Sequence, residues 1–294
     1  MTMKLQFDHS KKFQLDAIES TVKLFEGQQK FDASFVDFVD GVVPNKLTIN
    51  ENEIFENLKD IQKQNKIPIS ESFEGMNFSI EMETGTGKTY VYLRTIYELN
   101  KKYGFKKFII VVPSVAIREG TKKNFEITKD DFQILYNKIP IQSTEYSSKN
   151  ISYIRQFSNS NKIEVMIITR DSFNKDVNIM NTPQDKFYGK RPIELVKKTN
   201  PILILDEPQN MESGITKDAI ENLNPLLTLR YSATHKNPYN LIYRLSPVDA
   251  YQQKLVKKIE VLSIVEDANV NAANIDCHEI IPGKTIKAKL KLLK

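Results

Sequence analysis

The sequence has no tryptophan and only one cysteine, Cys277, among its 294 residues. A single cysteine excludes an internal disulfide. No apolar run approaches the roughly 18 residues that a membrane-spanning helix needs, and the N-terminus does not show the pattern of a signal peptide. With 40% hydrophobic and 27% charged residues, the chain is expected to be a globular cytoplasmic protein without membrane contact.

Arginine is also scarce, with seven residues in the chain, and the charge balance is uneven along the sequence. The net charge of +5 is the difference between 42 basic and 37 acidic side chains. Residues 284–294 contain five lysines and no acid, so the rest of the chain sums to zero. Composition alone is therefore only a weak indication of a nucleic-acid partner.

A glycine-rich stretch separates an apolar run from a helical pattern at residues 78–94, FSIEMETGTGKTYVYLR. Glycines allow a tight turn that brings backbone N–H groups close to a polyphosphate, a lysine can reach the β and γ phosphates, and a threonine hydroxyl can bind Mg²⁺. The stretch therefore predicts a phosphate-binding loop, although Met82 replaces the first glycine of the general pattern. The predicted contacts are Thr84, Gly85, Thr86, Gly87, Lys88 and Thr89.

From residue 78 onward, apolar runs alternate with helical patterns, which predicts an α/β fold with a mostly parallel sheet flanked by helices. Strands are expected at residues 78–82, 108–112, 132–136, 165–169, 202–205 and 227–232. Helices are expected at 11–27 and 54–64, and residues 30–75 are expected to fold onto the main domain. Ligands of such sheets bind at the carboxyl ends of the strands, so the residues that follow each strand are site candidates.

Two acidic residues, Asp206 and Glu207, follow the apolar run 202–205. At the end of a buried strand they lie where a Mg²⁺-nucleotide would bind. Asp206 is predicted to hold the metal, through water, and Glu207 to orient or deprotonate the attacking water. An exposed acidic loop is the alternative for this pair alone, but its combination with Lys88 favours the nucleotide site.

Polar residues also follow three other predicted strands. Pro113, Ser114 and Arg118 come after the strand at 108–112, Arg170 and Ser172 come after Thr169 at the end of the strand at 165–169, and Tyr231 is followed by Ser232, Ala233 and Thr234. Hydroxyls, backbone N–H groups and arginines are the groups that contact a phosphodiester backbone. Each set alone also fits an ordinary polar loop, but together they predict a nucleic-acid contact along one edge of the sheet.

The order of these motifs resembles superfamily 2 helicases and translocases, and more closely the Res subunit of type III restriction enzymes. The matching strings are residues 13–18 (FQLDAI), 82–89 (METGTGKT), 204–209 (ILDEPQ), 232–235 (SATH), 249–251 (DAY) and 255–261 (LVKKIEV). The DEPQ form, which ends in Gln209, and the run 249–261 favour the type III family. The resemblance covers roughly residues 10–265, and residues 30–75 are unmatched.

The resemblance implies a RecA-like P-loop NTPase domain that uses ATP and Mg²⁺ and acts on double-stranded DNA with a modification (methyltransferase) subunit. It implies that Gln14, with Phe13 beside it, reads adenine, and that Thr89 and Asp206 hold Mg²⁺. Lys88, Asp206 and Glu207 become the catalytic set. The coupling of hydrolysis to movement is assigned to Ser232, Ala233 and Thr234, and contacts with one nucleic-acid strand to Pro113, Ser114, Thr169 and Arg170.

The same resemblance divides the chain into a helical segment with the adenine-reading motif (1–77), a first RecA-like domain (78–245) and a linker (246–294). Motors of this family resemble two RecA-like lobes, of which the second supplies an arginine finger, followed by a nuclease. Neither an Arg-x-x-Arg spacing nor an acidic residue two before a lysine occurs here. We therefore expect no complete second lobe and no nuclease in these residues. Residues 259–265 and 284–293 are expected to be either the opening strands of that lobe or a solvated tail.

Three hypotheses remain open from the sequence. The first is the ATP-hydrolysing motor domain of a type III Res subunit. The second is the motor of a type I restriction enzyme or of another superfamily 2 DNA or RNA helicase. The third is a nucleotide-binding interaction module without useful turnover, because the loss of an arginine finger can lower the rate by about 10³ to 10⁵.

Overall fold

The computed structural model describes residues 7–31, 41–146, 151–172, 180–211, 214–257, 274–281 and 287–293. The chain forms two compact units, residues 1–256 and 257–294. Within the described ranges, no helix combines the length and the apolar character that a bilayer crossing requires.

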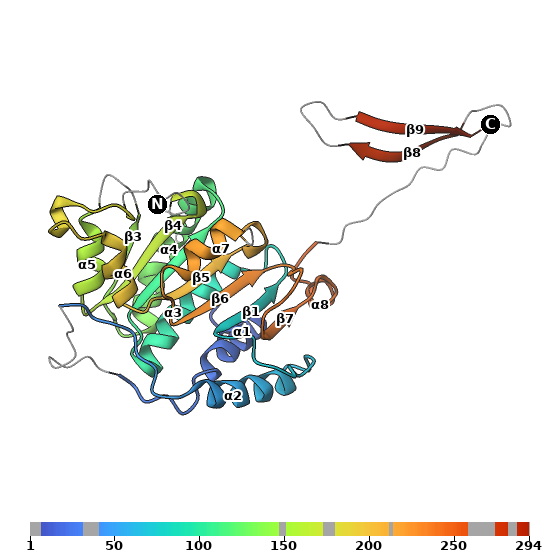
Figure 1. The fold of residues 1–294 in the computed structure, drawn as a ribbon. Helices are drawn as coiled ribbons and strands as arrows, with labels where there is room; N and C mark the ends of the chain where they lie inside the picture. The colour runs from blue at the N-terminus through green and yellow to red at the C-terminus, as the bar shows by residue number, and fades with distance from the viewer. Residues whose placement is uncertain are drawn as a thin grey trace, which may run out of the picture. The chain divides into compact units, whose positions relative to one another are not determined.

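The larger unit is built on a sheet of seven strands, ordered β3-β4-β2-β5-β6-β1-β7 (Figure 1). Every neighbouring pair is parallel, which confirms the predicted α/β class. The strands are β1 (Asn77–Met82), β2 (Lys107–Val112), β3 (Ile141–Glu145), β4 (Ile163–Thr169), β5 (Ile202–Asp206), β6 (Leu227–Ser232) and β7 (Leu241–Leu245).

Helices cover both faces of this sheet. The residues of β2 show the two layers, because Phe108 and Ile110 belong to one core cluster and Ile109 and Val111 to the other. Helices α1 to α4 contribute to the first cluster and α5 to α7 to the second. Burial on both faces explains why β2, β4 and β5 are nearly continuous apolar runs. The helices are α1 (Lys12–Lys23), α2 (Glu51–Gln64), α3 (Lys88–Tyr103), α4 (Val115–Leu135), α5 (Tyr153–Asn159), α6 (Pro192–Lys198), α7 (Gly214–Glu221) and α8 (Pro247–Gln252).

The segment before β1 is attached to the sheet through buried amides. The side chain of Asn45 donates to the carbonyl of Lys107 at 2.8 Å and accepts from the backbone N–H groups of Lys106 and Lys107. Farther along, Gln62 on α2 donates to the carbonyl of Leu241 at 2.9 Å. The prediction that this region folds onto the main domain is confirmed for residues 41–75, and residues 32–40 lie outside the described ranges.

One predicted strand is wrong. Residues 132–136 form the end of α4 and its cap. Thr121, Phe125, Thr128 and Phe132 are buried at spacings of three and four residues, so the apolar run there is the inner stripe of a long helix. Strands β3 and β7 were not among the predicted strands.

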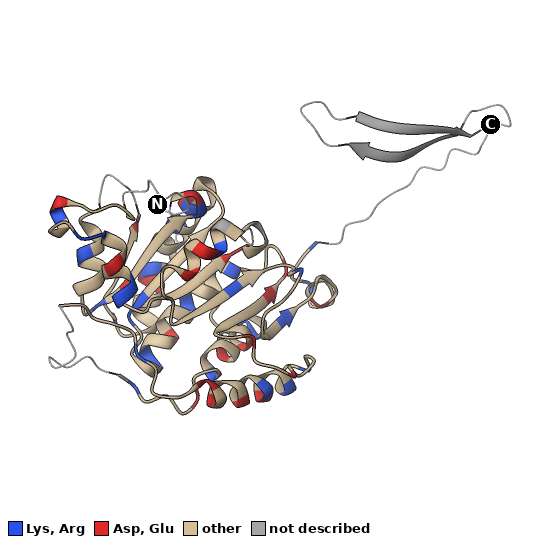
Figure 2. Ribbon diagram, viewed as in Figure 1, with Lys and Arg blue, Asp and Glu red and all other residues tan. Residues whose placement is uncertain are grey.

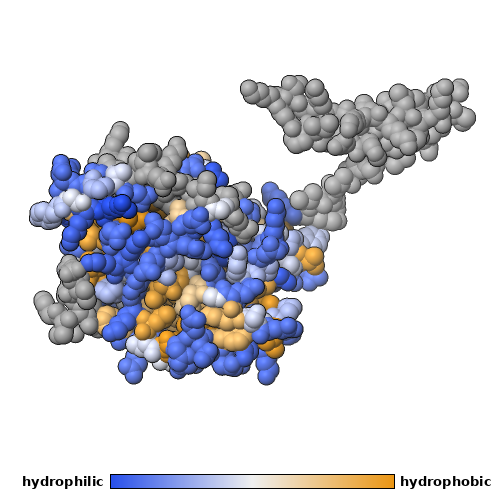
Figure 3. All heavy atoms as spheres, viewed as in Figure 1, coloured by the Kyte–Doolittle hydropathy of each residue, from blue (hydrophilic) through white to orange (hydrophobic). Residues whose placement is uncertain are grey.

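Lysine, arginine and acidic residues are interspersed over the larger unit (Figure 2). Hydrophilic residues cover most of the face shown in Figure 3, and hydrophobic residues show between them mainly in the lower half of that view. Isolated exposed apolar residues are ordinary on a globular protein.

The smaller unit contains an antiparallel pair, β8 (Asn274–Ile281) and β9 (Lys287–Leu293). A strand is therefore present within the predicted range 284–293, whereas 259–265 lies outside the described residues. That this unit begins a second lobe stays a prediction.

Candidate functional site

The pairing register brings the predicted motifs to one edge of the sheet. Apart from Phe13 and Gln14, which lie on α1, the predicted site residues lie at or shortly after the carboxyl ends of parallel strands, where ligands of such sheets bind. The register pairs at this edge are Val112 with Thr169, Asp206 with Tyr231, and Ser232 with Glu81.

The glycine-rich loop connects β1 to α3. Gly85 and Gly87 have φ values of +81° and +93°, in the left-handed region that favours glycine. Thr86 closes the turn, because its backbone N–H and its hydroxyl both donate to the carbonyl of Glu83. Since α3 begins at Lys88, the unpaired N–H groups of a helix N-terminus face the loop, as an anion-binding site requires.

Lys88, the first residue of α3, lies at the end of this loop. Its ammonium donates to the carbonyl of Met82 at 3.3 Å and forms an ion pair with Oε1 of Glu207 at 2.9 Å. Met82 contributes its backbone oxygen, and its own side chain is buried in the core. The replacement of the first glycine of the pattern therefore leaves the lysine contact in place.

Asp206 is a buried carboxylate with little compensating charge. Burial and, to a smaller extent, the negative charge of Glu207 raise the pKa of Asp206 to about 6, against the opposing effects of Lys88 and of a hydrogen bond from Tyr92. The Tyr92 hydroxyl lies 3.4 Å from Oδ2 of Asp206. An ionised carboxylate in such a place is stabilised by an added cation.

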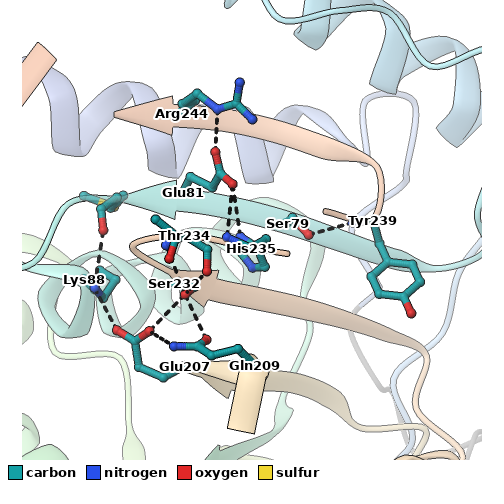
Figure 4. A network of polar contacts seen from close by, with 11 residues as sticks. Ser79, Glu81, Lys88, Glu207, Gln209, Ser232, Thr234, His235, Tyr239 and Arg244 are labelled. Atoms are coloured by element: carbon teal, nitrogen blue, oxygen red, sulfur yellow. Dashed lines mark hydrogen bonds and ion pairs between the residues drawn. The ribbon is translucent and has the colours of Figure 1, made fainter. Parts of the chain in front are cut away.

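Glu207 has a different environment. It follows β5 with a left-handed φ of +53°, and its Oε2 accepts from Gln209 and from Ser232, each at 2.9 Å (Figure 4). Burial acts to raise the pKa of Glu207, but the hydrogen bonds from Gln209, Lys88 and Ser232 outweigh it and hold the pKa below its usual value. Glu207 is therefore ionised at neutral pH, and its neighbour Asp206 is the acid with the raised pKa.

A cavity of about 640 Å³ opens over this edge. It is lined by the whole loop from Thr84 to Thr89, by Asp206 and Glu207, and by Gln14 on α1. The Gln14 amide donates to the carbonyl of Thr86 at 3.0 Å. Phe13 is buried in the core and is not among the described residues that line the cavity.

Several lining residues were missed in the sequence. Phe7 and Tyr90 stack with their ring centroids 5.7 Å apart, and both line the cavity. Tyr90 directly follows Thr89, which was the available signal for it. The remaining unpredicted lining residues are Asp8, Lys11, Ala116, Ile117, Gly120, Thr121 and Asn124.

Ser232 joins the predicted coupling segment to the acidic pair. Its hydroxyl lies within 3.0 Å of Oε2 of Glu207, of Oε1 of Gln209 and of the carbonyl of Thr234. One hydroxyl proton serves one acceptor at a time, so this serine can exchange its donation between Glu207 and the following loop. Ala233 and Thr234 form that loop with His235, whose backbone N–H lies 3.3 Å from Oε1 of Glu81 (Figure 4).

The predicted nucleic-acid residues lie at the same edge, after β2 and β4. Ser114 caps α4 by accepting from the N–H of Ile117, and Pro113 precedes it. Arg118 forms ion pairs with Glu145 at 2.7 Å and with Glu119 at 3.0 Å. The Thr169 hydroxyl lies 2.5 Å from that of Ser172, and Arg170 pairs with Asp171 at 3.0 Å. The fold brings these residues together, and their contact with nucleic acid stays a prediction.

The residues at this edge fit a Mg²⁺-nucleotide. The loop supplies backbone donors and an ammonium for phosphates, and Thr89 and Asp206 supply the oxygen ligands that Mg²⁺ prefers. Asp206 is buried beside Glu207, which raises its pKa, so a bound cation would stabilise its ionised form. Within the described residues, no group of three or more His, Cys, Asp or Glu side chains forms a metal site made by the protein alone.

Comparison with known sequences agrees with this geometry. A family profile described as "Type III restriction enzyme, res subunit" matches residues 10–237. The chain belongs to this family of type III Res subunits. It is 35% identical over 239 residues to the EcoP15I Res subunit of Escherichia coli and 33% identical over 247 residues to the EcoPI Res subunit of Escherichia phage P1. These alignments cover 73% and 74% of this chain but 24% and 25% of the relatives, so the chain spans about a quarter of their length.

Two solved structures with lower sequence identity are also similar to this chain. A nuclease-deletion mutant of the type ISP restriction-modification enzyme LlaGI, in complex with a DNA substrate mimic, is 14% identical with a TM-score of 0.41, over 71% of this chain and 21% of that one. The UvsW helicase of bacteriophage T4 is 14% identical with a TM-score of 0.35, over 71% of this chain and 63% of that one. The family profile confirms the resemblance to type III Res subunits, and the parallel sheet with the glycine-rich loop between β1 and α3 agrees with the predicted P-loop α/β fold.

Proposed function

We propose that this chain is the nucleotide-binding lobe of a DNA-dependent ATPase motor in a type III Res subunit. The observation that carries the proposal is the 2.9 Å ion pair between Lys88 and Glu207. It brings the lysine of the phosphate-binding loop and the acid that would activate water to one point, inside a cavity that the loop itself lines.

In this proposal the loop N–H groups and Lys88 bind the phosphates of ATP, and Gln14 lies at the side of the loop to read the base. Mg²⁺, when bound, neutralises phosphate charge, and Thr89 and Asp206 are the residues that would hold it. Glu207, ionised at neutral pH, orients water and accepts its proton. A change in the hydrogen bond between Ser232 and Glu207 alters the contact of Ser232 with the Thr234 carbonyl and so moves Ala233 and Thr234. Double-stranded DNA and a modification subunit are the proposed partners.

A nucleotide-binding module with little turnover is the second candidate. It is favoured by the cavity lining, in which the described residues include no arginine. The transition state would then lack an arginine finger to stabilise the charge on the phosphates, and loss of such an arginine lowers the hydrolysis rate by about 10³-fold to 10⁵-fold.

ATP hydrolysis with and without double-stranded DNA, together with binding of a fluorescent nucleotide, tests both candidates. DNA-stimulated turnover that is abolished by Lys88→Ala and by Glu207→Gln supports a working motor. Binding that is lost in Lys88→Ala, with negligible turnover in the unsubstituted chain, supports the binding module. A folded chain that binds no nucleotide would contradict both.

A further inference from the structure

The connection between β4 and β5 contains a compact loop at residues 184–191, which runs beside α5 and α6 (Figure 1). Its backbone closes on itself. The carbonyl of Gln184 accepts from the N–H groups of Phe187 at 2.8 Å and of Gly189 at 3.1 Å, and the N–H of Gln184 donates to the carbonyl of Lys190 at 3.2 Å. The loop is therefore organised before it meets a partner.

Two neighbouring aromatic residues of this loop have opposite surroundings. Phe187 is 3% exposed and belongs to the core cluster on the α5–α7 face of the sheet. Tyr188 is 88% exposed and has a left-handed φ of +54°. The buried ring anchors the loop, and the unusual backbone conformation turns the next ring outward. A left-handed backbone conformation is uncommon at a residue with a bulky side chain and costs free energy, so it directs attention to this position as a functional candidate.

An arginine from α5 backs both rings. The guanidinium carbon of Arg155 lies 5.0 Å from the ring centroid of Phe187 and 5.2 Å from that of Tyr188, and its NH2 group donates to the carbonyl of Lys186. A cation over a ring face stabilises the ring's orientation. Arg155 therefore holds Tyr188 from one side and leaves the rest of the ring to solvent.

The charge around the exposed ring has one dominant sign. Lys186, Lys190 and Arg191 are exposed and lie within three residues of Tyr188, and Asp185 is the acid of the loop. Figure 2 shows Lys and Arg segments on this loop and on the neighbouring α5. The same connection between β4 and β5 starts at Arg170, directly after Thr169, and both of these residues are predicted nucleic-acid contacts. An exposed ring among cations is the combination that binds single-stranded nucleic acid.

We propose that the loop at residues 184–191 is a contact for single-stranded DNA, in which an unpaired base stacks on Tyr188 and the flanking cations contact the adjacent phosphates. The inference rests on the proposed function, because it assumes a chain that acts on DNA. It adds a contact surface that lies outside the nucleotide cavity and needs no ATP.

The absence of tryptophan from the chain allows a direct test. Tyr188→Trp introduces a single fluorescent reporter at the proposed contact, and Ile134→Trp places the same reporter on α4 at a side chain that is 79% exposed. Both proteins are titrated with a 20-nucleotide oligothymidine in the absence of ATP. The titration is repeated with the same proteins carrying the additional substitution Lys88→Ala. Fluorescence anisotropy of a labelled oligonucleotide reports binding in parallel. If a base stacks at position 188, the fluorescence of Tyr188→Trp should be quenched, and the midpoint of the quenching curve should equal that of the anisotropy curve. The fluorescence of Ile134→Trp should not change.

Affinity provides an independent readout. Tyr188→Ala should weaken oligothymidine binding by about 5-fold to 150-fold, which corresponds to the loss of one base stack worth about 1–3 kcal/mol. Tyr188→Phe keeps the ring and should bind oligothymidine as tightly as the unsubstituted chain. Lys190→Gln should lower the slope of log Kd against log salt by about 0.7. DNA binding that leaves the tryptophan at 188 unquenched and Tyr188→Ala unimpaired would overturn this inference alone. Absence of single-stranded binding together with DNA-stimulated hydrolysis would overturn it and keep the motor, whereas loss of both DNA responses would overturn the DNA part of the proposed function as well.

Discussion

The replacement Gly87→Ala measures how closely the phosphate-binding loop fits against α1. Gly87 has a φ of +93°, and a Cβ built there would lie 2.7 Å from Nε2 of Gln14. The left-handed conformation costs a residue with a side chain about 1–2 kcal/mol. Gln14 must also move, which breaks its hydrogen bond to the Thr86 carbonyl, worth about 1 kcal/mol. We expect the free energy of unfolding to fall by about 2–3 kcal/mol, the sum of these two terms.

The neighbouring glycine supplies the matched control. Gly85 has a φ of +81°, and a Cβ there meets nothing within 4 Å. Gly85→Ala should therefore cost the backbone strain alone, about 1–2 kcal/mol. In a Gln14→Ala background the steric conflict at Gly87 disappears, so Gly87→Ala should there cost as little as Gly85→Ala. The expected coupling between Gln14 and Gly87 is about 1 kcal/mol, which exceeds the usual additivity error of about 0.3–0.5 kcal/mol.

Urea unfolding of the nucleotide-free proteins, followed by far-ultraviolet circular dichroism, gives the required free energies. The four proteins of the cycle and the Gly85→Ala control are compared at one pH and one salt concentration. If Gly87→Ala costs the same with and without Gln14, the side-chain contact contributes nothing and the reasoning is refuted.

Two further predictions concern buried polar contacts. Asn45→Ala should lower the free energy of unfolding by about 2–4 kcal/mol, because it leaves buried backbone groups of Lys107 unpaired; an unchanged urea midpoint would contradict this. Burial acts to raise the pKa of Glu81, but hydrogen bonds from His235 and Arg244 outweigh it and lower the pKa. The stabilisation by Glu81 is then present above its unfolded pKa and lost as pH falls through the folded pKa, so the difference in unfolding free energy between the unsubstituted chain and Glu81→Gln should be present at pH 7 and shrink below about pH 4.5. Equal differences at pH 7 and pH 3.5 would sink this account.

The central strands could be predicted because their environment leaves one simple pattern. β2, β4 and β5 are buried on both faces and read as short continuous apolar runs. β3 could not be predicted in this way, since only Ile141 of its residues is fully buried at this edge of the sheet. The error at residues 132–136 has the opposite cause, because a few apolar residues in a row at the end of a helix cannot be told from a strand without the helical spacing that precedes them.

Some residues of the candidate site could also be predicted from the sequence, and others could not. The loop, Asp206 and Glu207 carry chemistry in their residue types and could be predicted. The position of Phe7 could not be predicted, because it depends on tertiary contacts made by His9, two residues along the chain. His9 lies 2.9 Å from the hydroxyl of Tyr90 and 3.1 Å from Oδ1 of Asp131, and these contacts hold the N-terminal segment against the cavity.

The sequence also could not predict how Glu207 reaches the loop. In the sheet, β6 lies between β5, which carries the acid, and β1, which leads into the loop. Glu207 spans that distance through its left-handed backbone and a hydrogen bond from Ser232, the last residue of β6. In the proposed function, a phosphate bound by Lys88 would compete with Glu207 for the same ammonium, and the carboxylate would then be free to contact water while it keeps its hydrogen bond from Ser232. Glu207→Gln should accordingly bind nucleotide at least as tightly as the unsubstituted chain while it loses turnover, and weaker binding would show that the ion pair supports the loop rather than competing with its ligand.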